Sequence, residues 1–94
     1  MSKQLSQTEI ETRLAELEDW GTDGKALIKR YEFKNFAQSL AFVNKVGEVA
    51  ENKNHHPDIE FGWGYAQITF TTHDAKGLTE KDFEAADEID SLIP

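Results

Sequence analysis

The chain is predicted to fold as an α+β two-layer sandwich, in which helices cover one face of a four-stranded antiparallel sheet. Helix-like and strand-like periodicities follow one another in the order α-β-β-α-β-β-α. Turn signals at Asp23-Gly24 and near Gly64 fall inside the two strand-rich regions, where they favour antiparallel hairpins. The length of 94 residues suits a single domain over residues 1–94, without repeats or internal linkers.

The first third of the chain predicts a helix followed by a hairpin. Ser6 and Glu9 form a capping box, and apolar residues then recur at helical spacing, so we expect a helix over about residues 7–18. Beyond the first turn signal, loose alternation of apolar side chains over residues 25–33 predicts a half-buried strand. Residues around Trp20 are expected to form the other arm of this hairpin.

A longer second helix is expected over about residues 36–52, with Asn35 as its N-cap. Its main apolar stripe has i, i+4, i+7 spacing and comprises Phe36, Leu40, Val43, Val46 or Gly47, and Ala50. Phe42, Val46 and Val49 widen the stripe beyond what one sheet face normally needs. Two interpretations stay open: a generously buried core helix, or a helix whose remaining apolar edge meets a partner subunit.

The last part of the chain predicts a second hairpin and a third helix. Pro57 closes the second helix, because the residue before a proline disfavours the α region. Residues 59–65 and 66–72 alternate with opposite parity, which predicts two strands with a turn or bulge near Gly64. After a loop over residues 73–77, Thr79-x-x-Asp82 forms a capping box, and the helix that follows is lined by Phe83, Ala86, Ile89 and Ile93.

Composition excludes several classes of function. The formal net charge of -8, with dispersed Lys and Arg, argues against nucleic-acid binding. The absence of cysteine excludes disulfides, thiolate catalysis and sulfur-ligated metals. No apolar run approaches membrane-spanning length, and the polar stretch that starts at Met1 does not look like a signal peptide. We therefore expect a cytoplasmic protein without membrane association.

The chain has only three histidines, and all lie at predicted chain breaks. His55 and His56 close the second helix, whereas His73 follows the last strand. Imidazole is the side chain that exchanges protons most readily near neutral pH, so three converging histidines would indicate a catalytic site. The alternative is a surface pair attracted to a helix C-terminus, with His73 as a capping or solvated residue.

Two carboxylates and one aromatic residue complete the candidate set. Glu51 precedes His55 by four residues, so the two would share a helical face if the helix persists, and Glu51 could then orient the imidazole. Asp82 has a structural role in its capping box, which is compatible with orienting a histidine. Trp63 is a common type of core residue, but on the exposed side of a strand it could stack against a flat heterocycle.

Together these positions resemble a known family. The pattern Glu51-x3-His55-His56-Pro57-x5-Trp63-x9-His73-x8-Asp82 resembles the signature of the pterin-4a-carbinolamine dehydratases, and the likeness covers about residues 35–92. One position departs from it: Ile59 stands where the family commonly has tryptophan, which affects the pocket wall rather than the proton chemistry.

The resemblance implies a hydro-lyase that dehydrates 4a-hydroxytetrahydropterin to quinonoid dihydropterin and so supports tetrahydropterin recycling. It implies no cofactor and no metal. By residue, it implies His55 and His73 as the acid/base pair, His56 and Trp63 as substrate contacts, and Glu51 and Asp82 as orienting groups. It also implies a homodimer or homotetramer formed through helix packing. Which histidine donates and which accepts is left open.

Two other functions fit parts of the pattern. Three imidazoles and a carboxylate are a plausible zinc-ligand inventory, although adjacent histidines rarely reach one tetrahedral ion. A non-enzymatic interaction or regulatory module could use the same fold and act through the apolar stripe of the second helix.

Overall fold

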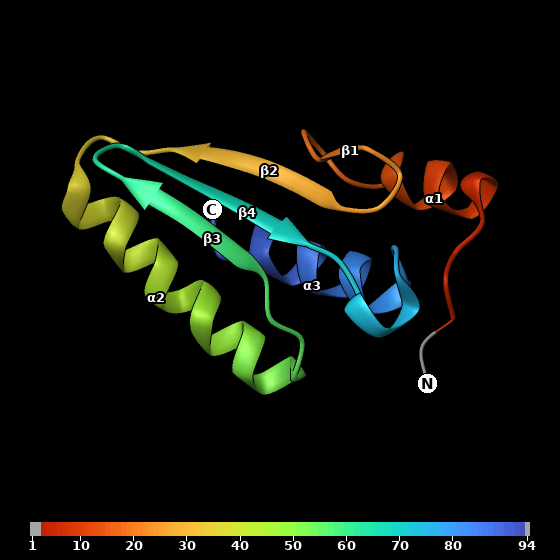
Figure 1. Cartoon of the computed structure of the whole chain (residues 1–94). Coiled ribbons are helices and arrows are strands. Elements are labelled where there is room, and N and C mark those ends of the chain that lie inside the picture. Colours follow the sequence, from red (N-terminus) through yellow and green to blue (C-terminus); the bar gives the residue numbers. More distant parts are fainter. Residues whose placement is uncertain (1–2, 94) are drawn as a thin grey trace.

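The computed structural model describes residues 3–93 and shows the predicted two-layer α+β sandwich (Figure 1). Four antiparallel strands lie in the order β1-β2-β4-β3, with bounds β1 (Gly21–Thr22), β2 (Leu27–Glu32), β3 (Asp58–Gly62) and β4 (Tyr65–Phe70). Helices pack on one face of this sheet: α1 (Gln7–Leu14), α2 (Phe36–Lys53) and α3 (Glu80–Asp90), with a 3-10 turn η1 (His73–Ala75) before α3. The predicted fold class and element order are confirmed. Met1, Ser2 and Pro94 lie outside the described residues.

The β3–β4 hairpin explains the parity switch seen in the sequence. Strand β3 ends at Gly62, and Trp63 and Gly64 form the turn, where Gly64 has a φ of +80° that L side chains rarely adopt. The turn reverses the chain, so Ile59 and Phe61 on β3 share the helix-facing side with alternate residues of β4. Those β4 residues are fully buried: Ala66, Ile68 and Phe70.

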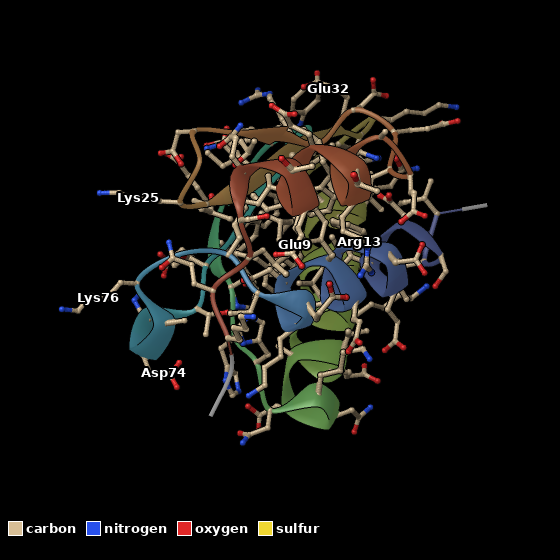
Figure 2. All side chains as sticks on the ribbon, turned by 90° about the vertical axis from the view of Figure 1, so that its right-hand side faces the viewer. Glu9, Arg13, Lys25, Glu32, Asp74 and Lys76 are labelled. Atoms are coloured by element: carbon tan, nitrogen blue, oxygen red, sulfur yellow. The ribbon has the colours of Figure 1, made fainter. Side chains whose placement is uncertain are left out.

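Two helices end earlier than the sequence predicts. The capping box of Ser6 and Glu9 starts α1 as expected, but the helix ends at Leu14 because the next amides form tighter i→i−3 bonds, such as Leu17 N to the Leu14 carbonyl. Arg13 of α1 lies beside α3 (Figure 2), and its guanidinium pairs with the Glu80 carboxylate of that helix. Helix α3 likewise ends at Asp90, so Ile93 lies beyond it and is 40% exposed.

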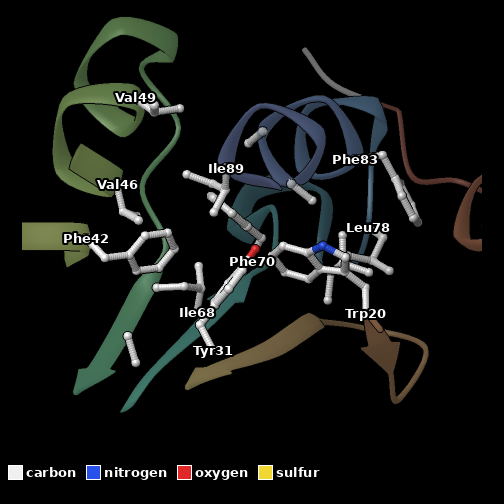
Figure 3. Packing of buried hydrophobic residues seen from close by; sticks show 14 of the residues in the cluster. Trp20, Tyr31, Phe42, Val46, Val49, Ile68, Phe70, Leu78, Phe83 and Ile89 are labelled. Carbon is white, nitrogen blue, oxygen red and sulfur yellow. The ribbon is translucent and has the colours of Figure 1, made fainter. Parts of the chain in front are cut away.

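The core lies between the sheet and helices α2 and α3 (Figure 3). Helix α2 contributes Phe42, Val46 and Val49, which are buried against β4 and α3. The buried face of α2 therefore differs from the predicted one, in which Phe36 and Leu40 were core residues. These two residues are 45% and 39% exposed. Within residues 3–93, no helix is long and apolar enough to cross a membrane.

Candidate functional site

Three element ends meet at one edge of the molecule and place all three histidines around a single cleft. These ends are the C-terminus of α2, the segment from β4 into η1, and the N-terminus of α3. The cleft has a volume of about 360 Å³ and is lined by His55, His56 and His73, together with Asn54, Thr71, Thr72, Asp74 and Lys81. Its size lies within the range of small-molecule sites.

The end of α2 aims the histidine pair. Asn54 adopts the left-handed conformation, with a φ of 51°. The His55 amide donates to the Ala50 carbonyl at 3.1 Å, and the Asn54 amide to the Glu51 carbonyl at 3.3 Å, the bonding pattern of a Schellman motif. This reversal separates the pair: the His55 side chain is 11% exposed, and that of His56 is 54% exposed.

The inner histidine, His55, is held by groups from two other elements. Its Nε2 lies 2.6 Å from Oδ1 of Asp82, and its ring is nearly parallel to that of Phe70, with centroids 5.8 Å apart. The expectation that Glu51 faces His55 is wrong, because the helix stops at Lys53 and the left-handed residue breaks the i, i+4 spacing. Asp82 is the partner of His55 instead.

The outer histidine, His56, is the one that contacts Glu51. Its Nε2 is bonded to the Glu51 carboxylate, and both side chains lie largely in solvent. A pair exposed in this way contributes little to stability.

His73 reaches the same cleft from the sheet side. It is the first residue of η1, and antiparallel pairing of Thr72 with Gly77 closes the loop that carries it. The His73 side chain is exposed, and within residues 3–93 it makes no side-chain hydrogen bond. The predicted convergence of the three imidazoles is therefore present in the fold.

Asp82 is the buried anchor of the site. It is fully buried at the third position of α3, and its Oδ2 accepts from the Thr79 amide at 2.9 Å, as the capping box requires. The same Oδ2 accepts from the Thr72 hydroxyl at 2.7 Å. The sequence places Thr72 on the same face of the strand as residues 66, 68 and 70, but sequence reasoning gave this polar residue no role in the site.

Trp63 is not brought to the cleft within one chain. It lies in the β3–β4 turn, whereas the histidines lie at the opposite end of that hairpin. Five strand residues at about 3.3 Å each separate the two ends. Trp63 is 72% exposed, so it is not a core residue, and it is not among the residues that line this cleft.

A larger cleft of about 470 Å³ lies at the other end of α3 and contains none of the histidines. Its central polar groups already pair with one another, since Lys29 Nζ lies 2.9 Å from Asp90 Oδ1. Within residues 3–93, no group of three His, Asp or Glu side chains is arranged to hold a metal ion.

Known proteins are similar to this chain in sequence and in fold. The family model for pterin 4 alpha carbinolamine dehydratase matches residues 3–92. A protein of a Picosynechococcus species, provisionally named a pterin-4-alpha-carbinolamine dehydratase, is 42% identical over 98% of this chain and all of its own length. A Rubrobacter xylanophilus protein with the same provisional name is 48% identical over 94% of this chain and 83% of its own.

Two solved structures resemble the chain. A transcriptional coactivator/pterin dehydratase from Brucella melitensis superposes with a TM-score of 0.91 and 26% identity, covering 98% of this chain and 100% of that one. A pterin dehydratase-like protein described as a RuBisCO assembly factor in the alpha-carboxysome gives a TM-score of 0.65 and 30% identity, covering 78% of this chain and 84% of that one. The family match over nearly the whole length shows that the chain belongs to the pterin-4-alpha-carbinolamine dehydratase family.

Proposed function

We propose that the protein dehydrates a 4a-hydroxytetrahydropterin to the quinonoid dihydropterin, with His55 and His73 as the acid/base pair. The observation that carries this proposal is the single cleft lined by all three histidines of the chain. His55 approaches from the end of α2 and His73 from η1, so the two imidazoles can act on different sides of a flat ring. Family membership supports the same reaction.

The chemistry needs one proton donor and one proton acceptor. In the substrate, the hydroxyl sits on a carbon bonded to a ring N–H. A protonated imidazole gives its proton to the hydroxyl, the carbon–oxygen bond breaks, and water leaves with the bonding electrons. The nitrogen lone pair forms the new C=N bond, while the neutral imidazole takes the N–H proton. Solvent then returns both histidines to their starting states.

Replacing the two proposed catalytic histidines tests the reaction. His55→Ala and His73→Ala should each lower kcat for dehydration of a synthetic 4a-hydroxytetrahydropterin by roughly 10²- to 10⁴-fold, the usual contribution of general acid/base catalysis. His56→Ala is the matched comparison, because we propose that His56 holds the substrate. It should raise KM more than it lowers kcat.

Circular dichroism of each variant must show that the fold is retained. Near-normal kcat in both folded alanine variants at positions 55 and 73 would rule out the proposed acid/base pair. A wild-type protein without measurable dehydration would rule out the reaction itself.

A non-enzymatic role is the second candidate, and one observation favours it. Helix α2 leaves an apolar stripe in contact with solvent, in which Phe36 and Leu40 are the most exposed members. The described RuBisCO assembly factor shows that a protein of similar fold has an assembly role. A wild-type protein that shows no dehydration but binds a protein partner through this stripe would favour this candidate.

We also propose that the α2 stripe joins two copies of the chain. Phe36 stacks on Phe61 of β3 at a centroid distance of 5.7 Å, so the stripe continues onto the edge strand of the sheet. The half-buried Val43 extends it along the helix. A second copy presenting the same stripe would cover apolar side chains on both chains at once.

A charge placed in the stripe tests this association. Leu40→Glu should convert an oligomer to a monomer in sedimentation equilibrium, because a buried carboxylate without a partner strongly destabilises an interface. Ala41→Glu adds the same charge to an exposed position of the same helix, about 100° away, and should leave the mass unchanged. A wild-type protein that is monomeric at high concentration would contradict the proposal.

A further inference from the structure

The buried hydroxyl of Thr72 is linked to His55 through Asp82. Thr72 is 4% exposed, and its Oγ1 lies 2.7 Å from Oδ2 of Asp82. The other carboxylate oxygen of Asp82 contacts Nε2 of His55 at 2.6 Å. Thr72 therefore touches the histidine only through the carboxylate.

Donor and acceptor can be assigned for each hydrogen bond that links Thr72 and Thr79 to Asp82. Thr72 has one hydroxyl proton and donates it to Asp82, so in its 2.8 Å contact with Thr79 Oγ1 the proton must come from Thr79. Thr79 Oγ1 in turn accepts from the Lys81 amide at 3.3 Å. The Thr79 hydroxyl thus donates to Thr72, and the Thr72 hydroxyl donates to the Asp82 carboxylate. The carboxylate also accepts from the Thr79 amide. Rotation of Asp82 would leave buried donors without a partner.

This arrangement determines which nitrogen of His55 carries a proton. A carboxylate accepts hydrogen bonds and has none to donate, so Nε2 must be the donor in the 2.6 Å contact. The neutral ring then carries its only proton on Nε2 and its lone pair on Nδ1. The stacked Phe70 ring holds the plane of the imidazole.

The remaining nitrogen of His55 is open to solvent. Nδ1 has no hydrogen-bond partner among the described residues, yet no half-buried or buried side chain of residues 3–93 has a buried polar atom without a partner. Nδ1 is therefore exposed, and His55 lines the histidine cleft. Because Asp82 occupies Nε2, Nδ1 is the nitrogen of His55 that is left for a substrate.

We propose that Thr72 is a positioning residue, which locks Asp82 so that His55 exchanges its proton with the substrate through Nδ1. The proposal rests on the dehydratase function proposed above and adds to it the reacting atom and the residue that fixes it. Thr72 itself does not touch the substrate in this scheme. Its hydroxyl acts by holding the carboxylate, and the carboxylate acts by holding the ring.

Nitrogen-15 NMR of the wild-type histidine side chains tests the assignment without any substrate. At a pH where His55 is neutral, its Nε2 should carry the proton and Nδ1 should show the signal of an unprotonated nitrogen. A neutral His55 with its proton on Nδ1 would overturn the proposal, whatever the enzymatic activity.

Substitution of Thr72 then tests the positioning role. Thr72→Val keeps the shape of the side chain and removes the hydroxyl, so it should mix the two tautomers of His55. It should also lower kcat about 10-fold or more, the usual effect of losing a hydrogen bond to the group that orients a functional histidine. KM should change much less. Thr72→Ser keeps the hydroxyl and should restore both the wild-type tautomer and most of kcat.

The two proposals fail in different ways. A folded valine variant with the wild-type tautomer and the wild-type kcat would overturn the role of Thr72 and leave the dehydratase function intact. A wild-type protein with the expected tautomer but no dehydration would overturn the function and leave the hydrogen-bond assignment intact. If the valine variant does not fold, the wild-type tautomer and the serine variant still test the proposal.

Discussion

At the scale of single residues, the site depends on one unusual backbone conformation. The left-handed Asn54 ends α2 and turns consecutive histidines to different environments, His55 toward Asp82 and His56 toward Glu51. A continuous helix would instead place residues 51 and 55 on one face, and the contacts of both histidines would change. One φ angle therefore decides which carboxylate each imidazole meets.

Substitutions at Asn54 should reveal this dependence. Asn54→Gly adopts the left-handed conformation without strain, so we expect unfolding free energy and kcat close to wild type. Asn54→Ala should cost about 1 kcal/mol, because alanine lacks the short polar side chain that lets asparagine adopt the left-handed conformation, and it should lower kcat by displacing the histidine pair. Urea unfolding followed by circular dichroism measures the first effect. Equal stability of the glycine and alanine variants would contradict the explanation.

At the scale of elements, the site is formed where helices and strands begin or end. His55 and His56 follow the C-terminus of α2, the end of the helix that carries partial negative charge. Asp82 lies in the first turn of α3, where partial positive charge favours a carboxylate. The two helix ends thus carry complementary groups into one contact, and the end of β4 brings His73 beside them.

The elements themselves could largely be predicted from the sequence. Capping residues such as Ser6, Asn35 and Thr79 act locally, so the helix starts that they mark agree with the structure. Helix ends were less predictable, because apolar residues such as Leu17 and Ile93 fit the helical period although the chain has already turned. Such turns depend on contacts between distant elements, which periodicity does not describe.

The histidines of the site could be predicted, but not the carboxylate that each of them meets. The three histidines were identified because they are rare and lie at chain breaks, and the fold brings them together. The pairing of His55 with Asp82 joins residues 27 apart, so it depends on how α3 packs beside α2. Trp63 fits an exposed strand position in the pattern, but Gly64 makes the tight turn there.

At the scale of the whole molecule, a second polar cluster closes the end of α3 opposite the histidine cleft. Asp90 accepts from the Trp20 indole at 3.0 Å, from Lys29 at 2.9 Å and from the Tyr31 hydroxyl at 2.6 Å. These donors come from the segment before β1 and from β2, so one carboxylate ties the last turn of α3 to the sheet. The two ends of α3 are thus anchored by Asp82 and by Asp90.

This second anchor predicts a loss of stability at alkaline pH. Burial, and then the hydrogen bond to Asp90 and its charge, raise the pKa of Tyr31 above its ordinary value of about 10. A pKa that is higher in the folded state means that the neutral hydroxyl stabilises the fold. Its contribution is fully present below about pH 10 and is lost as the pH rises above that value, at up to about 1.4 kcal/mol per pH unit.

Tyr31→Phe separates this contribution from other alkaline effects. At pH 8 the variant should be less stable than wild type by about 1 to 2 kcal/mol, because Asp90 loses a hydrogen bond. Between pH 10 and pH 11.5 the difference should shrink, since the variant has no hydroxyl to ionise at this position. Tyr65→Phe is the matched control, because it removes the other tyrosine hydroxyl from the outer face of the sheet and should keep the wild-type loss. Urea unfolding at each pH measures these differences. If the difference in unfolding free energy between wild type and Tyr31→Phe stayed the same at every pH, the Tyr31–Asp90 bond would not be the cause of the alkaline loss of stability.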